Sequence, residues 1–382
     1  MIPYSRQSIN NSDINSVIRV LKSNYLTQGP NVEKFENEIK KICQVKFSSS
    51  VNSATSALHL SCLALGLKKN DYLWTSPISF VASSNCALYC GAKVDFVDIN
   101  IQNFNLDINI LKQKLIEAKK EKKLPKILVA VHMAGVSCEM SEIKKLSIKY
   151  NFKIIEDASH CTGSRYKNLP VGSCKYSDIT VFSFHPVKII TTGEGGMILT
   201  NNNVLDSKIK ILRSSGINKN LSRKKLITKG LWFYEQQMLG YNYRMSDIAA
   251  ALGLSQSKKI NIFIKKRNII AKRYVKLLKN YPVKFQFINK NSLSSFHLFI
   301  IRVNKSLRKE LFNKMRKNGY YVNIHYIPIH LQPYYKRLGF KKGMYPLAEK
   351  YYNETLSIPI YPDLTKKNQL KIINLIKKTL KN

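Results

Sequence analysis

A lysine between an apolar segment and a glycine-rich turn is the residue in this sequence best placed to do chemistry. Lys188 follows the segment Phe182–Val187 and precedes the run Thr191–Gly196. Partial burial there would lower the pKa of the lysine amine, and a neutral amine can attack a carbonyl carbon. The alternative is a solvated surface charge, because the chain has 63 Lys and Arg residues. Gly195 and Gly196 predict either close backbone packing or a positive φ.

A carboxylate and a histidine follow a second apolar segment. The string Glu156-Asp157-Ala158-Ser159-His160 comes directly after the residues Lys153-Ile154-Ile155. A carboxylate at the end of a strand can pair with a protonated ring nitrogen, such as that of pyridoxal phosphate (PLP). His160 could approach the same ring. The alternative is that Asp157 caps a helix.

Small residues follow a third segment, in the string Asn52-Ser53-Ala54-Thr55-Ser56-Ala57-Leu58. A helix that begins here would offer free backbone N–H groups and the positive end of its dipole to a phosphate. Small side chains would let the phosphate approach closely. The alternative is an ordinary Ser or Thr cap of a helix with no ligand.

An aromatic residue follows a fourth segment, in the string Ser76-Pro77-Ile78-Ser79-Phe80-Val81. The ring of Phe80, at the start of a helix above the end of a strand, could stack on a cofactor ring. The alternative is that Phe80 is a core residue.

The segments that must position these clusters alternate between short strands and helices. The strands are expected at Lys46–Val51, Tyr72–Thr75, Lys93–Val97, Ile127–Val131, Lys153–Glu156, Ile179–Phe184 and Met197–Thr200. Helices are expected between several of them, at Thr55–Leu65, Phe80–Cys90 and Met140–Tyr150. This alternation predicts an α/β fold with a largely parallel sheet covered by helices on both faces. Ligands bind at the carboxyl ends of such strands, so we expect the four clusters to meet in one cleft.

The pattern changes after about residue 250. Lys-rich amphipathic helices are expected at Ser255–Leu278 and Lys305–Lys317, with strands at Phe296–Val303 and Tyr320–His325. We therefore expect a large α/β domain over residues 12–250 and a smaller α+β domain over residues 251–382 that includes residues 1–11. The basic segment Lys219–Lys229 is expected to be a mobile surface loop.

Composition excludes several classes of protein. The chain has 382 residues, 44% of them hydrophobic, which is ordinary for a globular protein. No apolar run reaches the roughly 18 to 20 residues of a membrane-spanning helix, and the first residues do not form a signal peptide. Seven scattered cysteines predict reduced thiols and a cytoplasmic protein. Cys86 and Cys90 lack the further ligands that zinc needs, so no metal is expected.

The net charge of +40 comes from Lys and Arg spread along the whole chain. We interpret it as a compositional bias towards Lys, with a secondary benefit for binding anionic nucleotide substrates. No nucleic-acid-binding motif accompanies it, so no nucleic acid is expected as a partner.

Together these strings resemble the DegT-type sugar aminotransferases, a branch of the fold-type I PLP enzymes. The resemblance runs from Leu26-Thr27-Gln28-Gly29-Pro30 to Leu356-Ser357-Ile358-Pro359. Its most specific parts are the Glu156–His160 string, the Phe182–Gly196 string and Gly240-Tyr241-Asn242-Tyr243-Arg244-Met245. The resemblance implies a fold-type I transferase with a seven-stranded sheet and PLP as its cofactor.

The resemblance also implies roles around the cofactor ring. Lys188 would be the catalytic residue and would hold PLP as a Schiff base. Asp157 would pair with the pyridine nitrogen, Phe80 would stack on the ring, and His160 would lie near the 3-hydroxyl.

Further residues would hold the phosphate and the substrate. The phosphate would contact Ala54, Thr55, Ser183 and the partner subunit's Asn242, which implies a homodimer with shared active sites. The residues near the nucleotide-sugar entrance would be Thr27, His325 and His330. For the two histidines the alternative is a structural role.

A closer similarity is to the aminotransferases of the pseudaminic acid pathway, which aminate C4 of a UDP-linked 4-keto-6-deoxy-N-acetylhexosamine. It rests on the strings at residues 4–9, 52–58, 87–90, 132–135 and 232–235, with Ala134 where many relatives have Tyr. L-Glutamate would be the amino donor, and Lys188 would carry the proton between the two reacting carbons. The alternatives are a C3 or C4 aminotransferase for another UDP- or dTDP-linked keto-sugar and, remotely, a regulatory or nucleic-acid-binding protein.

Overall fold

A computed structural model gives the fold and describes residues 1–218 and 228–380. The predicted loop Lys219–Lys229 therefore lies, except for its last two residues, outside the described residues. Of the described helices, none is long and apolar enough to cross a membrane.

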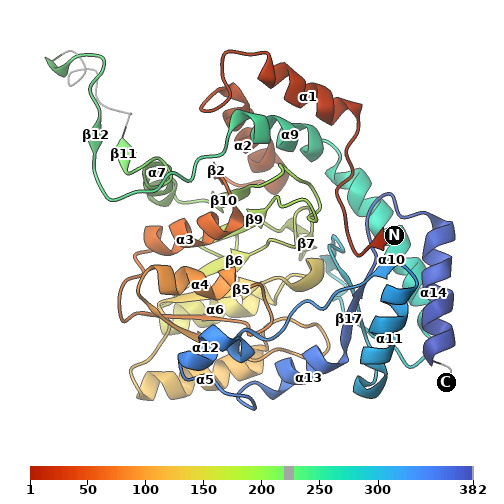
Figure 1. Ribbon diagram of the computed structural model, residues 1–382. Coiled ribbons are helices and arrows are strands. Elements are labelled where there is room, and N and C mark those ends of the chain that lie inside the picture. Colours follow the sequence, from red (N-terminus) through yellow and green to blue (C-terminus); the bar gives the residue numbers. More distant parts are fainter. Residues whose placement is uncertain (219–227, 381–382) are drawn as a thin grey trace.

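A seven-stranded sheet forms the centre of the molecule (Figure 1), with the strand order β2-β10-β9-β6-β5-β3-β4. Its strands are β2 (Phe47–Val51), β3 (Tyr72–Thr75), β4 (Lys93–Phe96), β5 (Ile127–Val131), β6 (Lys153–Asp157), β9 (Ile179–Ser183) and β10 (Gly196–Thr200). Only β10 runs antiparallel to its neighbours, so the sheet is mostly parallel, as the alternating pattern predicts.

Two sets of helices bury the two faces of this sheet. One face packs against α2 (Pro30–Cys43), α5 (Ile108–Lys120) and α6 (Met140–Tyr150). The other face packs against α3 (Ala54–Ala64), α4 (Ala82–Tyr89) and α7 (Asn203–Leu212). Neighbouring residues of β5 divide between the two cores, because successive side chains of a strand point to opposite faces. The predicted fold class is confirmed.

The C-terminal part has its own hydrophobic cluster around the antiparallel sheet β13-β15-β17. Its elements are β13 (Lys284–Phe285), α11 (Lys305–Lys317), β15 (Phe299–Arg302), β17 (Thr355–Ile358) and α14 (Lys366–Leu380). The helix α10 (Ile260–Leu278) packs its first half on the large core and its second half on this cluster. The domain boundaries expected from the sequence remain a proposal.

Smaller elements complete the fold. The helices are α1 (Asn11–Leu21), α9 (Asp247–Ser257), α12 (Pro333–Arg337) and α13 (Pro346–Glu354). The short strands are β1 (Ile2–Pro3), β7 (Arg165–Tyr166), β8 (Leu169–Pro170), β11 (Ile217–Asn218), β12 (Glu235–Gln236), β14 (Ser292–Leu293) and β16 (Tyr320–Tyr321). The pair β11 and β12 stands away from the body of the molecule (Figure 1).

Three predicted elements differ from the structure. The single helix expected at Ser255–Leu278 is two helices, because the chain turns at Lys258 and Lys259, and the Lys259 ammonium is held there by Asp13 of α1. The strand expected from Phe296 starts only at Phe299, since Phe296 has a φ of 46°. The strand expected at Tyr320–His325 ends at Tyr321, and Asn323, Ile324 and His325 line a cavity instead.

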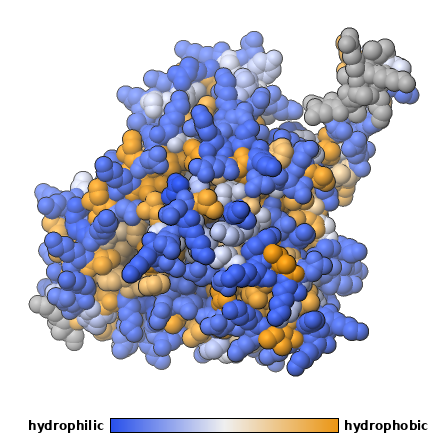
Figure 2. Space-filling model, turned by 180° about the vertical axis from the view of Figure 1, so that it is seen from behind, coloured by the Kyte–Doolittle hydropathy of each residue, from blue (hydrophilic) through white to orange (hydrophobic). Residues whose placement is uncertain are grey.

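Hydrophilic residues cover most of the face seen in Figure 2, and hydrophobic residues lie between them in scattered patches. This distribution agrees with a charge that is spread over the chain and not gathered in one segment.

Candidate active site

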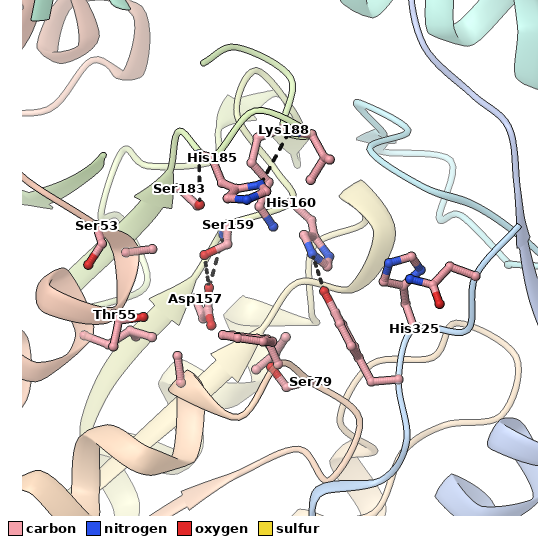
Figure 3. Close-up of a pocket in the computed structure, with 18 of the residues that line it drawn as sticks. Ser53, Thr55, Ser79, Asp157, Ser159, His160, Ser183, His185, Lys188 and His325 are labelled. Atoms are coloured by element: carbon pink, nitrogen blue, oxygen red, sulfur yellow. Dashed lines mark hydrogen bonds between the residues drawn. The ribbon is translucent and has the colours of Figure 1, made fainter. Parts of the chain in front are cut away.

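A cavity of about 450 Å³ lies at the carboxyl ends of the parallel strands. All four clusters singled out in the sequence contribute to its wall. The residues of those clusters that line it include Ala54, Thr55, Phe80, Asp157, His160, Ser183 and Lys188. Figure 3 shows most of them around one central space. The expectation that a parallel sheet gathers these clusters in one cleft therefore agrees with the structure.

Lys188 lies in the turn after β9, and its backbone N–H donates to the carbonyl oxygen of His185 at 2.9 Å. The side chain is half-buried and lines the cavity, so it is not a solvated surface charge. Burial lowers the pKa of the amine to about 8, and the opposing field of Asp157 reduces that shift. Among the described residues, no hydrogen bond or ion pair holds the Lys188 ammonium. A weakly basic, unpaired amine is suited to attack a carbonyl carbon.

Asp157 is the last residue of β6 and also lines the cavity. Its Oδ2 accepts a hydrogen bond from the Ser83 hydroxyl at 2.6 Å, and its Oδ1 accepts one from the Ser159 hydroxyl at 2.6 Å. No helix begins at Asp157, so the alternative that it caps a helix does not apply. The two hydroxyl donors fix the direction of the carboxylate and leave lone pairs for a cationic partner.

The first turn of α3 forms another wall. Ser53 is the N-cap, and its side chain accepts from the backbone N–H of Ser56 at 3.1 Å. Ser53 is therefore an ordinary helix cap, which was the alternative for this string. The N–H groups of the next two residues, Ala54 and Thr55, have no intrahelical acceptor. A Cβ at Gly196 would lie 2.7 to 2.8 Å from the backbone of Ser53 and Ala54. Close packing, not a positive φ, is thus the reason for this glycine.

Phe80 stands at the entry to α4 with 59% of its surface exposed. It lines the cavity and its ring centroid lies 6.4 Å from that of Tyr326. Phe80 is therefore not a core residue, which was the alternative expected from the sequence.

Two histidines occupy the side of the cavity opposite α3 (Figure 3). His160 is buried, and its Nε2 lies 3.2 Å from the hydroxyl of Tyr326. His325 is also buried and its Nδ1 lies 2.9 Å from the hydroxyl of Ser357. Burial and the charge of Lys188 lower the pKa of both imidazoles, that of His325 to about 3. Both rings are therefore neutral in the ordinary pH range.

Three predicted site residues do not line the cavity. Thr27 is exposed and forms an isolated bridge with Ser246, and Asn242 is exposed on a segment bridged to Ser214. His330 is buried, and its Nε2 lies 3.0 Å from the Glu349 carboxylate. This contact favours the structural alternative for His330.

Several residues that line the cavity received no role from the sequence, although some of them stand in the strings singled out there; they are Tyr4, Ser53, Ser79, Ser159, His185, Glu194 and Tyr326. Tyr326 stands next to His325 in the string that drew attention to the two histidines, so its position was a usable signal. Tyr4 comes from the N-terminus, and no local pattern indicates that it reaches the cavity.

The residues present fit PLP. A free helix N-terminus with small side chains suits its phosphate, an oriented carboxylate suits its ring nitrogen, and an unpaired amine suits its aldehyde. In the described part of the chain, no group of three or more His, Cys, Asp or Glu residues could hold a metal ion. The fold and this site define a PLP-dependent transferase.

Comparison with known proteins identifies the family. Residues 7–377 match the DegT/DnrJ/EryC1/StrS aminotransferase family. The chain is 41% identical to a UDP-4-amino-4,6-dideoxy-N-acetyl-beta-L-altrosamine transaminase of Campylobacter jejuni, over 100% of this chain and 96% of that protein.

Solved structures are also similar. PseC of Helicobacter pylori, an aminotransferase of pseudaminic acid biosynthesis, superimposes with a TM-score of 0.90 and 32% identity over 100% of this chain and 99% of its own. A Streptococcus pneumoniae protein described as a sugar aminotransferase, in its PMP form, gives a TM-score of 0.92 and 28% identity over 100% and 99% of the two chains.

The chain belongs to the DegT/DnrJ/EryC1/StrS aminotransferase family. It is a PLP-dependent aminotransferase, so the predicted family, enzyme class and cofactor are confirmed.

Proposed function

We propose that the protein transfers the amino group of L-glutamate to C4 of a UDP-linked 4-keto-6-deoxy-N-acetylhexosamine. The observation that carries this proposal is one cavity whose wall includes Lys188, Asp157 and the first turn of α3. The nature of the sugar is supported by 41% identity over the whole chain to the Campylobacter jejuni enzyme, whose name specifies a UDP-linked 4-amino-4,6-dideoxy-N-acetylhexosamine, the product of such an amination.

PLP, when bound, supplies an electron sink that stabilises negative charge on the carbon that loses a proton. We assign its ring nitrogen to the Asp157 carboxylate and one ring face to Phe80. The backbone N–H groups of Ala54 and Thr55, with the Ser183 hydroxyl, would hold its phosphate.

Lys188 would both anchor the cofactor and move the proton. As a free amine, its Nζ would take the proton from the α-carbon of L-glutamate. A pKa of about 8 suits this step, because the amine is partly neutral near pH 7.5 and still basic enough to accept a proton. Lys188 would return the proton to C4 of the sugar in the second half of the cycle.

The remaining assignments concern substrate and assembly. His160 would lie beside the cofactor ring, and His325, with Thr27, would lie near the sugar nucleotide. We propose a homodimer in which the partner subunit's Asn242 reaches the phosphate, because Asn242 is exposed and outside its own cavity. Seven free cysteines and a nucleotide-sugar substrate support a cytoplasmic location.

The test is to incubate the purified protein with L-glutamate and a panel of 4-keto nucleotide sugars and to identify the amino sugar by NMR. We expect amination at C4 of the UDP-linked N-acetylhexosamine. Efficient amination of a different nucleotide sugar alone would contradict the sugar assignment. The Lys188→Ala variant should lose turnover, and normal turnover in that variant would contradict the catalytic assignment.

A further inference from the structure

Tyr326 contributes a hydroxyl group to the cavity wall, and no role was assigned to it from the sequence. Its ring centroid lies 6.4 Å from that of Phe80 and 5.0 Å from that of His325. Its hydroxyl makes one hydrogen bond with another described residue, to His160 Nε2 at 3.2 Å.

The protonation of His160 decides which group donates in that hydrogen bond. The backbone N–H of Ala134 donates to His160 Nδ1 at 3.3 Å, so this nitrogen carries no proton. The imidazole is neutral, because burial and the nearby Lys188 keep its pKa well below the usual value. Its single proton therefore lies on Nε2, and Nε2 donates to the Tyr326 oxygen.

The Tyr326 hydroxyl accepts from His160, so its own hydrogen must point elsewhere. No other group of the described chain accepts that hydrogen, and the residue lines the cavity. Burial and the neighbouring Tyr4 and Asp157 raise the pKa of the phenol, which therefore stays protonated. The hydroxyl hydrogen of Tyr326 is thus available to a group bound in the cavity.

The chemical structure of PLP indicates the acceptor. Its 3-oxygen and the carbon that bears its phosphate are attached on opposite sides of the axis through the ring nitrogen and C4. With the nitrogen at Asp157 and the phosphate at α3, the 3-oxygen must face the other side of the cavity. Figure 3 shows Ser53 and Thr55 on one side of Asp157, and His160 on the other.

We propose that the Tyr326 hydroxyl donates a hydrogen bond to the 3-oxygen of bound PLP, held in that direction by Ala134 and His160. The inference rests on the proposed assignment of PLP to Asp157, Lys188 and α3. A donor at the 3-oxygen stabilises negative charge there. The oxygen then has a lower affinity for the proton that it shares with the nitrogen of Lys188. The PLP–lysine chromophore of the native enzyme therefore titrates at a lower pH than it would without Tyr326.

The test is an absorbance titration of the PLP-loaded enzyme and of its Tyr326→Phe variant. Loss of the donor should raise the pKa of the chromophore by about 1 to 2 pH units, the strength typical of a hydrogen bond to a charged group. The phenylalanine keeps the contacts with Phe80 and His325, so the variant should bind PLP stoichiometrically. Tyr345→Phe is the matched control, because its hydroxyl bonds to Asp95 outside the cavity and its loss should not move the titration.

An unchanged chromophore pKa in Tyr326→Phe would overturn the inference. If, in addition, the variant is slowed only in the half-reaction with the keto-sugar, the hydroxyl faces the sugar carbonyl and not the 3-oxygen. These failures are distinct from failure of the proposed function, in which the native protein would form no PLP–lysine chromophore or would aminate no keto-sugar.

Discussion

The hydroxyl of Ser83 on α4 lies 2.6 Å from the carboxylate of Asp157 on β6, although the two residues are 74 positions apart in the chain. Ser83 is itself 2.6 Å from the hydroxyl of Ser79. Asp157 therefore receives support from the loop that also carries Phe80. The residue assigned to the ring nitrogen and the residue assigned to the ring face are thus positioned by one connected segment.

The first prediction concerns this contact. Ser83→Ala removes one of the two hydroxyl donors to Asp157 and leaves the carboxylate freer to rotate. The loss of a hydrogen bond to a charged group costs about 1.5 kcal/mol, so PLP binding should weaken roughly tenfold. Titration of the apoenzyme with PLP, followed by absorbance, measures the affinity.

The neighbouring Ser84→Ala is the control, because the Ser84 hydroxyl contacts Tyr335 and not the cavity. Its PLP affinity should stay within about twofold of the native value. Equal losses of affinity in the two variants would show that the effect comes from α4 as a whole and not from Asp157.

The second prediction concerns pH. Burial lowers the pKa of Lys188 to about 8, so below that pH each unit removes about nine-tenths of the neutral amine. The rate at which the apoenzyme links covalently to PLP should rise about tenfold per pH unit below 8 and level off above it. Stopped-flow absorbance between pH 6 and 10 measures this rate. A midpoint near 10.5, the ordinary value for lysine, would show that the amine is not desolvated.

The sequence predicted the strands and the residues at their ends well, and for a physical reason. Parallel strands buried on both faces are short continuous apolar runs, and the residue after each run is forced to the same edge of the sheet. Lys188, Asp157 and Phe80 could therefore be placed together without a structure.

Other parts of the site depend on tertiary contacts that the sequence indicates weakly, as for Tyr326 beside His325, or not at all, as for Tyr4. Tyr4 reaches the cavity from the N-terminus, and Tyr326 from a segment that follows β16. His325 and His330 share one string, yet a 3-10 turn at Ile329–Leu331 directs His330 to Glu349 in the interior. Spacing alone could not separate the two histidines, because the turn is fixed by packing.

The third prediction concerns stability. Arg267 of α10 is fully buried, and its guanidinium donates to the carbonyl oxygens of Phe296, His297 and Ile360. Arg267→Ala would leave these three carbonyl oxygens without that donor and open a cavity. We expect a loss of about 3 to 5 kcal/mol in the free energy of unfolding, measured by urea denaturation of the apoenzyme.

Arg273→Ala, two turns further along the same helix, is the control. Arg273 is only partly buried and contacts Gln369, so its loss should cost about 1 kcal/mol or less. A similar loss in both variants would mean that Arg267 contributes through helix packing and not through the three carbonyls.

The last prediction tests the shared active site. Tyr241 and Tyr243 stack at 5.0 Å, and both rings pack near His59 of α3. Asn242 lies between them on an extended segment, and because side chains alternate along such a segment, it points outward to where a second subunit could meet it. If the partner subunit's Asn242 completes the site, the activity of a heterodimer should depend on which subunit carries each substitution.

Lys188→Ala and Asn242→Asp should each be nearly inactive as homodimers, the second because a carboxylate repels the phosphate. Their heterodimer, purified with two different tags, contains one site with both native residues. It should recover about half of the native activity per dimer, as two equivalent sites would require.

The reciprocal heterodimer pairs a native subunit with one that carries both substitutions. Neither of its sites has both residues when Asn242 acts across the interface, so it should be nearly inactive. If Asn242 served its own subunit, the results would be reversed: the first heterodimer would be inactive, and the second would keep about half of the activity. The two heterodimers contain the same substitutions in the same number, so a difference between them can arise only from which subunit supplies Asn242.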